Sequence, residues 1–208
     1  MAGLDDREHV HAETRAQWRE WLVGNHEKST GVWLVSWRSS TGRPSVGYEE
    51  SVEEALCVGW VDSKGGKIDD ERSKLWFAPR NPRSAWARTN KERVARLEAA
   101  GLMLPAGLRA VEVARANGAW SMLDDVENLV VPPDLEAAFA AHPGAREHWD
   151  AFPRSARRAI LEWIVQARTE PTRAKRIAET AAKAAIGERA NEWRPKTDPG
   201  QASRIHGV

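Results

Sequence analysis

The amino-acid sequence predicts an α+β fold, in which a small mixed β-sheet with flanking helices is followed by an all-α C-terminal lobe. Short runs rich in β-branched and aromatic residues lie at 31–37 and 75–78, next to Gly, Ser or Pro, as buried strands do. From Pro133 onward, apolar residues recur only at helical spacing. We therefore expect three parts: an α+β domain over 1–125, a helical region over 126–189 and a loose tail over 190–208, which has few apolar anchors.

The first half should contain one helix before the first strand and a hairpin after it. Apolar residues at helical spacing predict a helix over 12–23. The segments 59–62 and 75–78 are expected to pair as a hairpin, with Lys-Gly-Gly-Lys at 64–67 as its turn. The prolines at 79 and 82 disfavour helix in the residues before them, so a rigid loop should follow the hairpin.

Helix starts are indicated by capping signals. Ser51 with Glu54, and Thr89 with Glu92, have the spacing of capping boxes, so helices are expected from these residues to about 58 and 100. Pro105 should be the first residue of another helix, which ends near residue 118. The helices of the C-terminal region are expected at 134–141, 144–150, 155–168 and 172–186.

Composition excludes several classes of protein. A hydrophobic fraction of 41% and a charged fraction of 29% are near globular averages, so the chain should fold. No run approaches the roughly 18 to 20 apolar residues of a membrane span. The first fifteen residues are acidic and polar where a signal peptide is basic and then apolar, which favours a cytoplasmic location. The lone Cys57 cannot form an internal disulfide and is expected in the core.

Common catalytic motifs are absent from the sequence. There is no G-x-x-x-x-G-K-[ST] phosphate loop, no G-x-G-x-x-G, no G-x-S-x-G elbow and no H-E-x-x-H. His9 and His11 lie two residues apart, but nothing nearby completes a metal-ligand set. We therefore expect no cofactor and no metal site.

Charge is distributed unevenly along a chain whose net charge is only +1. Between residues 72 and 96, eight basic residues stand against Glu92 alone, which gives +7. Such a segment can recruit an anionic partner, although a solvated helix face produces similar runs. Because the whole chain is nearly neutral, we do not expect nucleic acid as the partner.

The stretch 59–90 combines tryptophans, acids and arginines, and we take it as the candidate working surface. Guanidinium groups bind carboxylate or phosphate in bidentate fashion and stack on aromatic rings. Alternatively, Asp62 and Asp69 pair with arginines to hold the hairpin and loop, or the stretch contacts a protein partner. The candidate ligand-binding residues are Trp60, Asp62, Arg72, Arg80, Arg83, Ser84, Trp86 and Asn90, and the candidate catalytic bases are Asp62 and Asp69.

The same stretch contains four short motifs: Ala-Leu-Cys-Val-Gly-Trp-Val-Asp at 55–62, Asp69 to Arg72, Phe-Ala-Pro-Arg at 77–80 and Ser84 to Asn90. In these motifs it resembles the YdeI/OmpD-associated family, also called bacteriocin-protection proteins. A second matching segment begins at Ser155, so the resemblance covers roughly 12–189. Ala78 and Ala87 stand where the family has hydroxyl residues. The family name implies protection against bacteriocins or cationic peptides, and it implies no reaction.

Three functions follow from these observations. The first is a cytoplasmic binding protein that recognises a small anionic or peptide-like molecule and contributes to antimicrobial or stress tolerance. The second is an enzyme with Asp62 or Asp69 as general base and an arginine clamp. The third is binding of single-stranded nucleic acid through the basic stretch and its tryptophans. Binding of a small molecule ranks first, because the enzyme lacks a motif and the nucleic-acid binder lacks a broad basic face.

Overall fold

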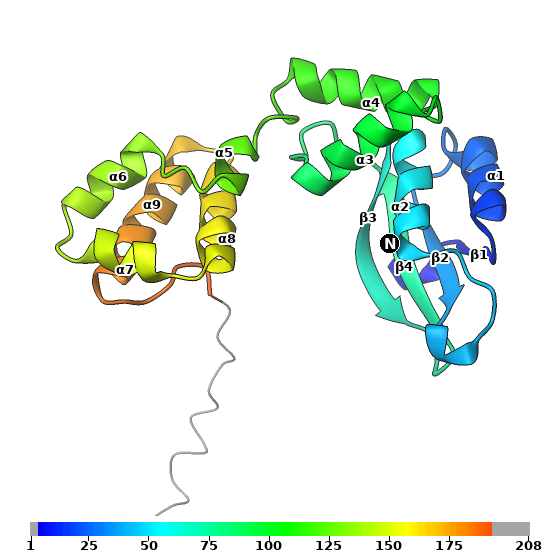
Figure 1. The fold of residues 1–208 in the computed structure, drawn as a ribbon, viewed down its shortest axis with the longest axis horizontal. Coiled ribbons are helices and arrows are strands. Elements are labelled where there is room, and N and C mark those ends of the chain that lie inside the picture. The colour runs from blue at the N-terminus through cyan, green and yellow to red at the C-terminus, as the bar shows by residue number, and fades with distance from the viewer. Residues whose placement is uncertain (1–3, 193–208) are drawn as a thin grey trace, which may run out of the picture. The chain divides into compact units, whose positions relative to one another are not determined.

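The computed structural model describes residues 4–192 of the chain (Figure 1). The chain divides into two compact units, residues 1–124 and 125–208. Most of the expected tail, from residue 193 on, lies outside the described residues. Unit 1 combines a sheet with helices and unit 2 is helical, so the predicted α+β class with an all-α C-terminal lobe is confirmed.

The sheet of unit 1 has four strands in the order β1-β2-β4-β3 and is mixed, as predicted. The strand β1 (His9–His11) runs parallel to β2 (Val32–Trp37), whereas β4 (Arg72–Pro79) is antiparallel to both β2 and β3 (Trp60–Lys67). β1 was not predicted, because three residues with a single apolar member give no strand pattern.

The hairpin was predicted correctly, but its turn was not. Gly65 and Gly66 lie within β3, next to an irregularity in the pairing between Asp62 and Gly65. The chain turns instead after Lys67, where the Asp69 carboxylate accepts hydrogen bonds from the backbone N–H groups of Glu71 and Arg72. An aspartate that bonds the backbone two residues on makes a turn without glycine, which explains why the glycine signal misled.

Helices of unit 1 are α1 (Arg15–Asn25), α2 (Tyr48–Cys57), α3 (Arg88–Ala99) and α4 (Pro105–Ala116), with short 3-10 turns at Leu4–Asp6 and Ser39–Thr41. Pro105 is the first residue of α4, as predicted. Both predicted capping boxes are wrong. α2 begins after Gly47, so Ser51 lies inside the helix and its hydroxyl donates to the Tyr48 carbonyl. α3 begins after Ala87, without a side-chain cap.

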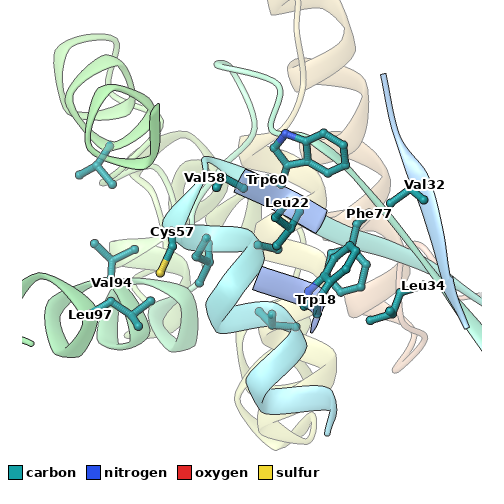
Figure 2. Packing of buried hydrophobic residues seen from close by; sticks show 14 of the residues in the cluster. Trp18, Leu22, Val32, Leu34, Cys57, Val58, Trp60, Phe77, Val94 and Leu97 are labelled. Carbon is teal, nitrogen blue, oxygen red and sulfur yellow. The ribbon is translucent and has the colours of Figure 1, made fainter. Parts of the chain in front are cut away.

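The core of unit 1 lies between the sheet and these helices. Figure 2 shows Trp18 and Leu22 of α1 beside Phe77 of β4, with Cys57 on the other side of α2 near α3. The Trp18 indole donates to the Ser51 carbonyl at 3.0 Å, so this large core side chain also has its polar group satisfied. Cys57 is a buried core residue, as predicted.

One carboxylate is buried under α1. Glu54 is 3% exposed and accepts from Arg15 Nε at 2.5 Å and from Arg19 Nη1 at 2.6 Å. Two guanidinium groups therefore compensate this charge, and α1 is fixed to α2 by ion pairs as well as by apolar packing.

Unit 2 is built from helices alone. Its elements are α5 (Asp124–Glu127), α6 (Pro133–Ala140), α7 (Ala145–Ala151), α8 (Arg154–Val165) and α9 (Glu170–Ala185). The short α5 was not predicted, and α8 ends three residues earlier than expected. Glu170-Pro171 was expected to separate helices, but it forms the first turn of α9 behind the N-cap Thr169, a position that suits proline. Among residues 4–192, no helix is long and apolar enough to cross a membrane.

Candidate functional site

Arg80 follows β4 directly and is the centre of the candidate site. Its backbone N–H donates to the Gly59 carbonyl at 3.0 Å, which fixes the start of the loop. Its guanidinium carbon lies 3.9 Å from the ring centroid of Trp86, and Nη2 donates to the Ala85 carbonyl at 2.5 Å. The predicted pairing of Arg80 with Trp86 is therefore present. Trp86 is only 2% exposed, so the arginine and the core cover the ring.

The charge of Arg80 is not compensated by an ion pair. Its Nε is buried and has no hydrogen-bond partner, and none of the ion pairs among residues 4–192 includes this side chain. Burial lowers the pKa of Arg80 from its usual range to about 10, while the negative charge of Asp62 opposes this shift. Charges that are withdrawn from solvent are normally paired in proteins, and the half-buried guanidinium of Arg80 departs from this rule.

Asp62 is bound by a tyrosine on the neighbouring helix. The Tyr48 hydroxyl, at the start of α2, donates to Asp62 Oδ2 of β3 at 3.0 Å. Partial burial of the phenol, together with the negative charge of Asp62, raises the pKa of Tyr48. The tyrosine therefore stays protonated, and its hydrogen bond holds the Asp62 carboxylate near Arg80.

Asn90 orients a second arginine beside this pair. Arg93 of α3 donates from Nη1 to Asn90 Oδ1 at 2.7 Å, and its other nitrogens donate to the Glu49 carboxylate at 2.5 and 2.9 Å. The hydrogen bonds to Glu49 raise the pKa of Arg93, so Arg93 stays charged. The cluster of Tyr48, Asp62, Arg80 and Arg93 thus unites residues of α2, β3, α3 and the proline loop, and we call it the Arg80 cluster.

A cavity of about 670 Å³ lies beside Tyr48. It is bordered by the ends of β2 and β4, the loop before α2 and the first turn of α2. Its lining is rich in hydroxyl groups and also carries two arginines: Ser36, Ser39, Ser45, Ser51, Ser73, Arg38 and Arg43. The Ser45 hydroxyl is buried and has no partner within residues 4–192. Tyr48 is therefore shared by the cavity and the Arg80 cluster.

The other predicted site residues lie apart from this cluster. Trp60 is 1% exposed and belongs to the core. Asp69 and Arg72 form an ion pair of 2.6 Å at the opposite end of β4, where Asp69 also stabilises the turn. Hydrogen bonds from Arg72 lower the pKa of Asp69, whereas a general base at neutral pH needs a raised one. Arg83 is exposed and Ser84 half-buried in the proline loop.

Tyr48 and Arg93 were not among the predicted site residues. Tyr48 is the single tyrosine of the chain, and that rarity was the one signal that marked it. Arg93 has no such signal, because it sits in a helix with several other surface arginines. Both residues reach the site through contacts between α2, α3 and β3 that follow from the tertiary packing.

Two family models match different parts of the chain. Residues 10–110 match a domain of unknown function, DUF8412. Residues 128–187 match the family described as "Bacteriocin-protection, YdeI or OmpD-Associated". Unit 2 thus carries a YdeI/OmpD-associated segment. No curated protein and no solved structure matches the chain.

The two matches lie on different units of the chain. The YdeI/OmpD-associated match supports the predicted family over residues 128–187, which belong to the helical unit. The Arg80 cluster lies in unit 1, within the range of the uncharacterised domain. The YdeI/OmpD-associated match therefore gives no information on a ligand of unit 1.

Proposed function

We propose that this protein is a cytoplasmic binding protein that recognises a small anionic or peptide-like molecule and contributes to antimicrobial or stress tolerance. The binding part rests on one observation, the half-buried guanidinium of Arg80 that has no carboxylate bonded to it. The tolerance part is supported only by the description of the family that unit 2 matches. The cytoplasmic part is supported by the single, unpaired Cys57.

A carboxylate or phosphate suits the donors that Arg80 keeps free. Nη2 is used by the Ala85 carbonyl, while Nη1 has no partner among the described residues. Nη1 is therefore the donor to which we assign the anion. Because the guanidinium is already held against Trp86, an anion gains a charge-assisted hydrogen bond without the cost of ordering a long side chain.

The two alternative functions find less support. The tryptophans of the central stretch that would stack on bases are 1% exposed at Trp60, 9% at Trp76 and 2% at Trp86, which disfavours single-stranded nucleic acid. For catalysis, Asp62 accepts the Tyr48 hydroxyl and Asp69 stabilises a turn, so both carboxylates have structural partners. We therefore place binding above catalysis.

The proposal is tested by titration of small anions into the full-length protein, with calorimetry and tryptophan fluorescence as readouts. The probes are inorganic phosphate, acetate and diglycine, which carry a phosphate, a carboxylate and a peptide carboxylate. We expect at least one to bind, and Arg80→Gln to weaken it at least ten-fold, as loss of a charge-assisted hydrogen bond of about 1.5–3 kcal/mol implies. Arg83→Gln, on the same loop, is the control and should change affinity less than two-fold. Equal affinities of the wild type and Arg80→Gln would refute the site.

A further inference from the structure

The sheet of unit 1 has a second face, which does not form the main core. Residues opposite one another in neighbouring strands point to the same side, and the register places His9, Trp33 and Trp76 in one row. The next row holds His11, Val35 and Lys74. The alternate residues, such as Leu34 and Leu75, pack against the helices instead. This second face therefore carries aromatic and basic side chains.

A cavity of about 500 Å³ lies on this face. Its volume is within the range of small-molecule sites, roughly 300 to 1,000 Å³. Five nitrogen-bearing side chains line it, together with a valine and an isoleucine: His9, His11, Lys67, Arg72 and Lys74. Among the residues that line it, none is acidic.

Aromatic rings hold the cations of this cavity in place. Lys74 Nζ lies 4.4 Å from the ring centroid of Trp33, and the Arg72 guanidinium lies 5.9 Å from that of Trp37. The ring of His11 packs edge-on against Trp37 at 4.8 Å. Lys74 is only 12% exposed, so its charge is partly desolvated before any ligand arrives. Such preorganised cations lose little side-chain entropy when they bind an anion.

Each cation already has a carboxylate partner, but these partners lie at exposed positions. Lys74 pairs with Asp5 at 2.7 Å, Arg72 with Asp69 at 2.6 Å and Lys67 with Asp70, and the acids are 75%, 41% and 95% exposed. Exposed pairs of this kind contribute at most about 1 kcal/mol. The ammonium groups keep further donors for a ligand, since each has three N–H bonds.

We propose that this cavity is a second binding site of unit 1 and takes a small molecule with two linked phosphate groups. Three cations and two histidines around about 500 Å³ match two neighbouring anionic groups better than one. The valine and isoleucine in the lining contact the less polar part of such a molecule. The site does not rest on the Arg80 cluster, because the two share no residue.

The test uses inorganic pyrophosphate as the probe, with full-length protein, EDTA and low salt, in a calorimetric titration. Pyrophosphate should bind at least ten-fold more tightly than inorganic phosphate. Lys67→Gln and His11→Gln change exposed side chains, so they should leave the fold intact and weaken pyrophosphate binding at least five-fold each. Lys28→Gln changes an exposed lysine outside the cavity and serves as the matched control, and its affinity should equal that of the wild type.

Arg80→Gln separates this proposal from the proposed function. It should bind pyrophosphate as the wild type does, even if it loses the anion at the Arg80 cluster. The second site is disproved if pyrophosphate does not bind, if it binds no better than phosphate, or if Lys67→Gln and His11→Gln bind it like the wild type. Loss of pyrophosphate binding in Arg80→Gln alone would place the anion at the Arg80 cluster and would equally overturn the second site.

Discussion

Replacement of Arg80 by methionine distinguishes a binding site from a structural ion-pair network. Burial lowers the pKa of Arg80 to about 10, well below the usual range of an arginine. At about 1.4 kcal/mol per pKa unit, the charged guanidinium costs the folded protein roughly 3 kcal/mol. This free-energy cost applies fully at neutral pH, which lies below the folded and the unfolded pKa, and it would be relieved only as pH rises above about 10.

Methionine removes this cost together with the favourable contacts of the arginine. The contact with Trp86 contributes about 0.5–2 kcal/mol, and the hydrogen bond to the Ala85 carbonyl contributes about 1.5–3 kcal/mol. The terms largely cancel, so Arg80→Met should lower the free energy of unfolding by no more than about 2 kcal/mol. Anion binding should be lost at the same time. If Arg80 instead belonged to a buried ion pair, the loss would be about 3–5 kcal/mol.

Urea unfolding of the full-length protein measures the change, followed by both tryptophan fluorescence and far-ultraviolet circular dichroism, because two units need not unfold in one step. Arg83→Met, on the same loop, is the control and should leave stability and binding unchanged. A loss of 3 kcal/mol or more in Arg80→Met, without any anion effect on wild-type fluorescence, would refute the reasoning. Arg80 would then be a structural residue.

Three further predictions concern the framework of unit 1. Gly107→Ala should destabilise the protein by about 1–3 kcal/mol in urea unfolding, because the added Cβ would lie 2.4 Å from the Cys57 carbonyl oxygen. Gly24→Ala should stabilise the protein by about 0.5–1 kcal/mol in the same assay, because its added Cβ would have no atom within 4 Å. Cys57 should react with a thiol reagent at pH 8 far more slowly in native than in urea-unfolded protein, because burial raises the pKa of its thiol. Glu54→Gln should cost about 3 kcal/mol in the same unfolding assay, because it removes the buried anion that Arg15 and Arg19 share and leaves Arg15 paired with Glu53 alone.

Each of these expectations has a result that would contradict it. Equal stability of Gly107→Ala and Gly24→Ala would show that α4 does not pack tightly on the end of α2. Rapid labelling of Cys57 in native protein would show that its helix opens easily. A Glu54→Gln variant as stable as the wild type would mean that solvent compensates the arginines as well as the buried carboxylate does.

Sequence reasoning worked best where a local pattern decides the structure. The strand 32–37 is rich in β-branched and aromatic residues, and Pro105 starts its helix because proline fits that position. It failed where several local solutions compete. Ser51 and Thr89 had capping spacing, yet the helices begin earlier, after Gly47 and Ala87. Packing of the helices on the sheet set those boundaries, and no local signal reports it.

The same distinction applies to the Arg80 cluster. The approach of Arg80 to Trp86 was predictable, because six positions separate them on a loop stiffened by prolines. The burial of Trp86 was not, since tryptophan serves cores and ligand surfaces alike. The bond between Tyr48 and Asp62 joins the start of a helix to a strand fourteen residues later, and it depends on how α2 lies on β3.

The contiguity of the two units has a consequence for synthesis in the cell. The hydrophobic cluster of unit 1 draws its buried members from Ala12 to Ala119, so all are made before unit 2 begins at residue 125. At about 5–20 residues per second, the ribosome needs roughly 4 to 17 seconds to add the 84 residues from 125 to 208. Small domains fold within about a second or faster. The nascent N-terminal half can therefore acquire its native sheet while translation continues, before the helical half is available to mispair with it.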